Sequence, residues 1–136
     1  MTKKLHLRVM TPQRTVLDVP QVELVVAPGS EGELGILPNH APLLTWLKSG
    51  LVRYRVEGKD RFCGLEGGFL EVVRNTVSIL ADKAVLPQEV DRKRAQEARE
   101  RAAELLKQRL AGTDFKQVEA QMRRALLELK LVEQLK

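Results

Sequence analysis

Apolar and polar residues alternate along the first two-thirds of the chain, which is typical of half-buried β-strands. Residues 5–10 read Leu-His-Leu-Arg-Val-Met, with an apolar residue at every second position. Short runs rich in glycine, proline, asparagine and aspartate separate this strand from others like it. Many short strands divided by such turns predict a β-sandwich or barrel. We predict strands at residues 5–10, 15–17, 22–26, 44–47, 51–56, 61–65, 69–74 and 76–80.

One stretch departs from this alternation. Residues 27–44 read A-P-G-S-E-G-E-L-G-I-L-P-N-H-A-P-L-L and combine three glycines and three prolines with five large apolar side chains. Glycine and proline disfavour both a helix and a central strand, whereas a fully solvated loop would not need so many apolar residues. The stretch therefore predicts a long, shaped and partly buried loop.

After Pro87 the pattern becomes helical. Residues 88–110 are rich in strong helix formers, and Pro87 suits a first helical turn. Gly112 suits the end of that helix, and Thr113 or Asp114 suits the cap of the next one. We therefore predict an α+β protein, with an N-terminal antiparallel β-sandwich at residues 1–84 and a C-terminal antiparallel two-helix hairpin at residues 85–136.

The two predicted helices carry different apolar stripes. The first presents mainly alanines, and the second presents large side chains at spacings of three and four. Four further leucines lie beyond this seam, so we expect their face to seek the β-domain or another protein. The stripes are Ala95, Ala98, Ala102 and Leu105, then Phe115, Val118, Met122, Ala125, Leu129 and Val132; the additional leucines are Leu126, Leu127, Leu131 and Leu135.

Composition and charge narrow the function classes. The hydrophobic fraction of 43% and the charged fraction of 30% are ordinary for a globular protein. A net charge of +5 suggests nucleic-acid binding, but residues 1–87 hold 11 basic against 9 acidic side chains and residues 88–136 hold 12 against 9. The excess is thus dispersed, and aromatic residues for base stacking make up only 4%. This disfavours a nucleic-acid adaptor.

Motifs for catalysis or metal binding are missing from the sequence. It contains no Walker loop, no G-x-S-x-G, no H-E-x-x-H and no cysteine pair, and its only histidines are His6 and His40. Cys63 lies in an apolar run and is expected to be a small buried residue rather than a nucleophile. No long apolar run or leader pattern is present, so we expect a soluble protein of a reducing compartment that is not an enzyme by itself.

Three stretches together resemble the epsilon subunit of F-type ATP synthases. They are G-S-E-G-E-L-G-I-L-P-N-H-A-P-L-L within residues 27–44, L-E-G-G-F-L-E-V at residues 65–72 and V-S-I-L-A-D at residues 77–82, followed by the helical hairpin. The resemblance covers essentially the whole chain. Because no targeting segment precedes the first strand, we expect a bacterial form.

The resemblance implies a non-catalytic subunit on the rotor's central stalk that helps couple proton flow to ATP synthesis. It implies binding to the gamma subunit and the c-subunit ring, peripherally at the cytoplasmic face of the cell membrane, with no required cofactor. It also implies that the hairpin can extend toward the alpha/beta head and inhibit ATP hydrolysis. At the rotor contacts, Glu33 corresponds to a residue facing the c ring and His40 to one facing gamma. Basic candidates for the inhibitory contacts are Arg92, Arg99, Lys107, Arg109, Arg123 and Arg124.

Some bacterial members of this family bind ATP through Ile/Leu-Asp-x-x-Arg-Ala at the start of the first helix. The matching stretch here is Val90-Asp91-Arg92-Lys93-Arg94-Ala95. The resemblance therefore implies a nucleotide site at Asp91, Arg94 and Ala95, with Arg101 and Arg124 as further candidates, and ATP as a regulatory ligand. Against it, Glu128 aligns where binding members have an additional arginine. Asp91 and Arg94 also suit a simple ion pair, as do Arg124 and Glu128.

Two alternatives to the rotor subunit are a nucleotide-sensing module whose folded hairpin binds ATP, and the disfavoured nucleic-acid adaptor. The first would bind ATP as its main activity, and the second would form a salt-sensitive complex with nucleic acid. Co-purification with the gamma subunit and the catalytic head distinguishes the rotor subunit from both.

Overall fold

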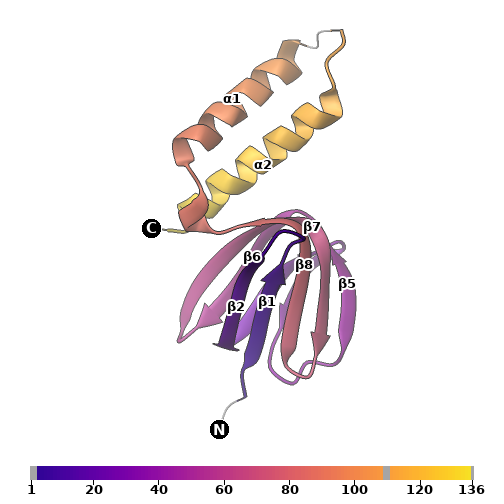
Figure 1. Ribbon diagram of the computed structural model, residues 1–136, viewed down its shortest axis with the longest axis vertical. Helices are drawn as coiled ribbons and strands as arrows, with labels where there is room; N and C mark the ends of the chain where they lie inside the picture. Colours follow the sequence, from indigo (N-terminus) through magenta and orange to yellow (C-terminus); the bar gives the residue numbers. More distant parts are fainter. Residues whose placement is uncertain (1–2, 109–110, 136) are drawn as a thin grey trace. The chain divides into compact units, whose positions relative to one another are not determined.

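The computed structural model describes residues 3–108 and 111–135. Within these residues, eight strands are followed by two α-helices, which confirms the predicted fold class (Figure 1). The chain divides into two compact units, Met1–Leu86 and Pro87–Lys136, which we call the β-domain and the hairpin.

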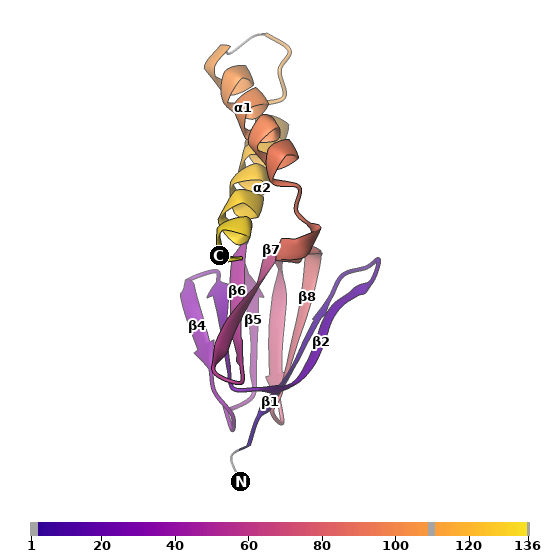
Figure 2. The same ribbon diagram turned by 90° about the vertical axis from the view of Figure 1, so that its left-hand side faces the viewer.

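The strands of the β-domain form one continuous network. Neighbours pair in the order β2-β1-β8-β7-β5-β3-β4, and β6 additionally pairs with β3 and β7. All pairs are antiparallel except β1 with β8, and Figure 2 shows β2 and β4 at opposite edges. The strands are β1 (Leu5–Met10), β2 (Thr15–Val22), β3 (Leu24–Gly29), β4 (Gly32–Ile36), β5 (Leu43–Leu47), β6 (Gly50–Val56), β7 (Lys59–Val73) and β8 (Thr76–Val85).

The core of the β-domain follows the predicted alternation. Leu5, Leu7 and Val9 of β1 are buried while the residues between them are half-buried. Cys63 is buried, as expected for a small apolar residue, and belongs to the same core. Neighbouring strands contribute equivalent inward positions, which include Val25, Ile36, Val52, Leu65, Leu70, Val72, Val77 and Ile79.

Strand β7 corrects the sequence prediction of two strands separated by Glu66-Gly67-Gly68. The structure has one strand of 15 residues, in which Gly67 has φ 73° and Gly68 has φ 129°. These glycines bend the strand instead of ending it, because both φ values are open to a residue without Cβ. Before the bend β7 pairs with β6, after it β7 pairs with β5, and β8 follows it on the other side along both halves.

The prediction of one long loop at residues 27–44 is also wrong. Strand β3 continues to Gly29, and a tight turn at residues 30–31 leads into β4. An edge strand tolerates glycine better than a central strand does, and a Cβ on Gly29 would lie 2.6 Å from the carbonyl oxygen of Gly32. Only residues 37–42 remain as a loop, which we call the 37–42 loop.

The hairpin consists of α1 (Arg92–Gln108) and α2 (Phe115–Glu133), preceded by a short 3₁₀ helix, η1 (Pro87–Glu89). The first helix begins later than predicted. Pro87 opens η1, whereas Asp91 accepts a hydrogen bond from the Arg94 backbone N–H at 3.2 Å and caps α1. Asp114 caps α2 as predicted, accepting from the Gln117 N–H at 3.2 Å, and Gly112 has φ 85°.

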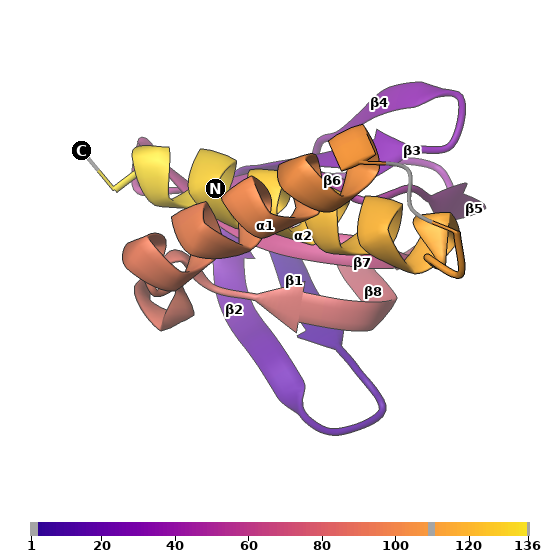
Figure 3. The ribbon, with the colours of Figure 1, turned by 90° about the horizontal axis from the view of Figure 1, so that it is seen from above.

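The two helices pack along the predicted seam. Ala95 and Ala102 of α1 are buried, as are Val118, Ala125 and Val132 of α2. Figure 3 shows the helices lying alongside each other, and α2 also contacts η1. The surplus leucine face is smaller than predicted. Leu127 and Leu131 are buried, whereas Leu126 and Leu135 are exposed.

Replacing Gly68 with alanine should lower the stability of the β-domain. A Cβ there would lie 2.2 Å from the Leu80 carbonyl oxygen, and the φ of +129° is unfavourable for a residue with a side chain. We expect a loss of about 3 kcal/mol in the free energy of unfolding. The matched control is Gly35→Ala, since nothing lies within 4 Å of the Cβ built there, and it should change stability by no more than about 0.5 kcal/mol. Urea unfolding followed by the fluorescence of the single tryptophan measures both. Equal stabilities of the two variants would contradict this account of the bend.

Candidate functional site

An apolar row crosses four strands on the outer face of the β-domain. Pairing register places Trp46 of β5 opposite Phe69 of β7, Phe69 opposite Leu80 of β8, and Leu80 opposite Met10 of β1. Trp46 is 68% exposed and Leu80 is 43% exposed. These four residues form what we call the apolar row, and Leu44, which is 67% exposed, extends it along β5.

The two aromatic residues of the apolar row are in direct cross-strand contact. The rings of Trp46 and Phe69 meet edge to face, with centroids 5.6 Å apart and an interplanar angle of 73°. A contiguous exposed apolar surface of this kind usually marks a protein interaction site. The row was not predicted from the sequence, because apolar residues that alternate along a strand were assigned to the core. Leu80 was the available signal, since it follows the core residue Ile79 directly.

The predicted rotor residues lie on β4 and in the loop after it. Glu33 is exposed on β4, in register with Pro28 of β3. His40 lies in the 37–42 loop, where its Nδ1 is 2.7 Å from the Ala41 carbonyl oxygen. The backbone N–H of His40 donates to the Leu37 carbonyl oxygen at 3.2 Å. The imidazole is therefore engaged locally by its own loop.

A pair of asparagines fixes the 37–42 loop against the turn between β7 and β8. The Asn39 backbone N–H donates to the Asn75 side-chain oxygen at 2.5 Å, and the Asn75 amide nitrogen donates back at 3.4 Å. Both residues have positive φ, 68° and 62°, which asparagine tolerates better than most residues. The loop that carries His40 is thereby joined by hydrogen bonds to the turn between β7 and β8.

The hairpin contains an open pocket of about 610 Å³ between α1 and α2. This is the size of an ordinary small-ligand site. All five residues predicted for nucleotide binding line it, namely Asp91, Arg94, Ala95, Arg101 and Arg124. The remaining lining residues are Glu89, Ala98, Leu105, Gln121, Ala125 and Glu128.

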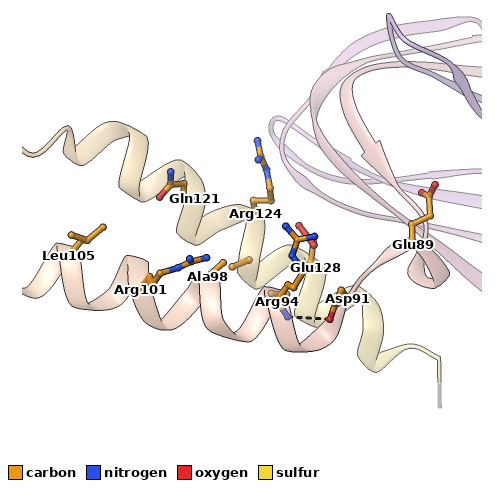
Figure 4. Close-up of a pocket in the computed structure, with 11 residues that line it drawn as sticks. Glu89, Asp91, Arg94, Ala98, Arg101, Leu105, Gln121, Arg124 and Glu128 are labelled. Carbon is orange, nitrogen blue, oxygen red and sulfur yellow. Dashed lines mark hydrogen bonds between the residues drawn. The ribbon is translucent and has the colours of Figure 1, made fainter.

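Local sequence explains how the pocket forms. Arg94 and Arg101 lie seven residues apart on α1, so their side chains leave the same helix face. The small side chains of Ala95, Ala98 and Ala125 leave space between the helices. Arg94 of α1 and Glu128 of α2 both line this space, and Figure 4 draws them among the residues around the pocket. The ion pair that the sequence suited for Asp91 and Arg94 is not formed; Asp91 instead accepts a hydrogen bond from the Arg94 backbone N–H as the cap of α1.

The candidate inhibitory residues are distributed over both helices. Each of those within the described residues is exposed, and Arg124 alone among them also lines the pocket. They are Arg92, Arg99 and Lys107 on α1 and Arg123 and Arg124 on α2; Arg109 lies outside the described residues.

Two charged clusters elsewhere in the β-domain tie strands together. Arg55 donates from Nε to Asp60 Oδ1 at 2.9 Å within the β6–β7 hairpin, and this hydrogen bond lowers the pKa of Asp60. His6 of β1 bonds Asp18 of β2, which likewise lowers the pKa of the Asp18 carboxyl. Both clusters are exposed, and each joins the two strands of a single pair. We therefore interpret them as cross-strand contacts that stabilise the sheet.

Within the described residues, no group of three histidine, cysteine, aspartate or glutamate side chains is placed to hold a metal ion. Neither α1 nor α2, as far as the structure describes them, is long and apolar enough to cross a membrane.

Comparison with known proteins places these features in a family. Residues 4–87 match the family described as the beta-sandwich domain of the ATP synthase delta/epsilon chain. The ATP synthase epsilon chain of Carboxydothermus hydrogenoformans is 53% identical over 109 residues, which cover 80% of this chain and 81% of that one. The epsilon chain of Syntrophobacter fumaroxidans is 41% identical over 133 residues, 98% of each chain.

Solved structures agree on the fold. A chain in the cryo-EM structure of the Euglena gracilis mitochondrial ATP synthase aligns with a TM-score of 0.69 and 23% identity, covering 99% of this chain and 81% of that chain. A chain from the central stalk and c ring of the Tetrahymena thermophila mitochondrial enzyme aligns with a TM-score of 0.55 and 20% identity, covering 99% of this chain and 98% of that chain. With the bacterial relatives and the matched β-domain, these findings confirm the resemblance, and the chain belongs to the ATP synthase delta/epsilon family.

Proposed function

We propose that this protein is a non-catalytic subunit of the rotor's central stalk in a bacterial F-type ATP synthase. There it helps couple proton-driven rotation to ATP synthesis, peripherally at the cytoplasmic face of the membrane. The proposal is supported by identities of 53% and 41% to bacterial ATP synthase epsilon chains. The single structural observation that carries the proposal is the apolar row. A stalk subunit needs a surface through which it binds a partner protein, and the apolar row provides one.

The apolar row is the proposed contact with the gamma subunit. Its tryptophan and its neighbour Leu44 are each about two-thirds exposed, with values of 68% and 67%. Large aromatic side chains of this kind commonly dominate the binding energy of an interface. Glu33 on the β4 edge is proposed to face the c ring, and His40 on its fixed loop is proposed to face gamma.

Substituting the apolar row should weaken gamma binding without unfolding the β-domain. For Trp46→Ser and Leu80→Ser, each alone, we expect losses of about 2 kcal/mol in binding, which is roughly thirtyfold in Kd. The control Leu126→Ser removes a comparably exposed leucine from the hairpin and should leave gamma affinity unchanged. Biolayer interferometry with purified gamma measures the Kd. Wild-type affinity in both row variants would exclude this surface.

The hairpin is proposed to inhibit ATP hydrolysis by extending toward the alpha/beta head. Support comes from its organisation as a separate compact unit and from five exposed basic residues suited to acidic segments of a partner. Exposed Leu126 and Leu135 add apolar contact surface. Such an element is bistable, since its helices have one set of contacts when paired and another when extended.

Deleting residues 88–136 should leave the protein assembled in the complex, because the β-domain has its own core, and should increase ATP hydrolysis by the complex. The full-length variant Arg99→Ala/Arg123→Ala should raise hydrolysis in the same direction by a smaller amount. Lys130→Ala, an exposed basic residue outside the candidate set, is the control. Coupled-enzyme assays on reconstituted complexes measure the rates. Unchanged hydrolysis after the deletion would remove the inhibitory role.

A second candidate function is nucleotide sensing by the hairpin. The pocket supports it, because all five residues of the predicted nucleotide site line one cavity of about 610 Å³. Arginine side chains suit phosphate oxygens through charge-assisted, bidentate hydrogen bonds. The cavity requires α1 and α2 to be paired, so a bound nucleotide would favour the paired hairpin over the extended one.

Titrating the isolated protein with ATP should give saturable binding, and Arg94→Ala should weaken it roughly tenfold because a charge-assisted contact is lost. Arg92→Ala is the matched control, since Arg92 belongs to the same turn of α1 but does not line the pocket. Isothermal titration calorimetry measures both. Absence of saturable binding at millimolar ATP would exclude the sensing function.

A further inference from the structure

The turn between β7 and β8 consists of two residues, Arg74 and Asn75. It joins the paired residues Val73 and Thr76, and both of its residues have positive φ, 49° and 62°. Two-residue hairpin turns with positive φ at both positions favour glycine at the second position, because glycine adopts this backbone at no steric cost. The turn itself would therefore accept glycine at position 75, and the asparagine side chain must serve something other than the turn.

Asn75 joins three segments of the β-domain. Its backbone carbonyl oxygen accepts the His6 N–H at 2.8 Å, near the start of β1. Its side-chain oxygen accepts the Asn39 backbone N–H at 2.5 Å, and its side-chain nitrogen donates to the Asn39 side-chain oxygen at 3.4 Å. The bond to β1 thus uses only the backbone of Asn75, whereas both bonds to the 37–42 loop use its side chain. Substitution of the side chain can separate these two roles.

The other hydrogen bonds of the 37–42 loop stay within it. The His40 N–H donates to the Leu37 carbonyl oxygen, and the His40 Nδ1 lies 2.7 Å from the Ala41 carbonyl oxygen. Two of the six loop residues are prolines, which have no N–H to donate. In the part of the chain that the structure describes, the hydrogen bonds that connect this loop to another segment are the two to Asn75.

We propose that Asn75 is a positioning residue for binding to gamma, because its side chain holds the 37–42 loop, and with it His40, in the conformation that binds. The proposal rests on the function proposed above, in which His40 faces gamma. It places a determinant of gamma affinity 36 residues away from Asn39 in the chain. Because the shorter of the two bonds reaches the Asn39 backbone, the Asn75 side chain carries the effect and the Asn39 side chain contributes little.

Glycine substitutions at both asparagines test the anchor, since both positions have positive φ and glycine tolerates it. In Asn75→Gly the amide of residue 39 should exchange with solvent roughly fivefold faster, because it loses its hydrogen-bond acceptor. The matched control Asn39→Gly keeps the backbone N–H that Asn75 accepts, so its exchange should be that of wild type after correction for intrinsic rates. Solvent-exchange NMR on the full-length protein measures both. Equal exchange in the two variants would overturn the proposal.

Rescue by the conservative variant separates the anchor from the turn. Asn75→Asp keeps an acceptor oxygen for the Asn39 N–H and should exchange as wild type. Urea unfolding should show that all three variants remain folded, because the backbone bond from His6 is present in each. Fast exchange in Asn75→Asp as well as in Asn75→Gly would overturn the role of the side-chain oxygen.

Gamma affinity, measured by biolayer interferometry, tests the positioning role. Asn75→Gly should weaken binding of the full-length protein roughly fivefold, whereas Asn75→Asp and Asn39→Gly should bind as wild type. In a His40→Ala background the further effect of Asn75→Gly should fall below about twofold, because the two residues act through the same loop.

The outcomes distinguish the positioning role from the proposed contact itself. Wild-type affinity in Asn75→Gly, together with weaker binding in His40→Ala, would overturn the positioning role and leave the contact of His40 with gamma intact. Wild-type affinity in His40→Ala would instead exclude that contact, and with it any positioning of His40 for gamma.

Discussion

The bend in β7 is the constraint on which the β-domain depends. At Gly68 the backbone lies so close to the Leu80 carbonyl that a Cβ would be 2.2 Å from its oxygen. This contact lets a single strand of 15 residues pair with β6 before the bend and β5 after it. Two strands that never pair with each other are thereby joined through β7, and the network curves around one core.

The outer surface is a consequence of the same arrangement. Because β5 and β8 flank the second half of β7, Trp46, Phe69 and Leu80 come into line across three strands. Met10 joins this line through the parallel pairing of β1 with β8. The proposed rotor contact is therefore set by strand register over residues far apart in sequence, and the 37–42 loop is held separately by its asparagine pair.

Local chemistry accounts for the parts of the fold that were predicted correctly. The strand at residues 5–10, the Asp114 cap and the order of β-domain and hairpin all follow from short-range pattern. The errors came from glycine, which was read as ending strands at residues 66–68 and preventing them at residues 32–36. Whether a glycine bends, turns or terminates a strand depends on what packs against it, and that is a long-range property.

The candidate sites likewise divide into features that follow from local sequence and features that depend on long-range packing. Arg94 and Arg101 were placed on one face from helical spacing alone, and both line the pocket. The apolar row was missed because cross-strand register cannot be read from a single strand. Glu128 was identified from the sequence, but its place in the same pocket as Arg94 required the pairing of the two helices.

The parallel pairing of β1 with β8 also bears on how the protein is made. It joins the first strand of the β-domain to the last, as in the register of Leu7 with Val77. On the ribosome this sheet cannot close until its eighth strand has emerged, and such distant pairings form slowly. The hairpin follows next, with contacts local in sequence that form rapidly. The hairpin is thus synthesised after all the strands of the β-domain are available.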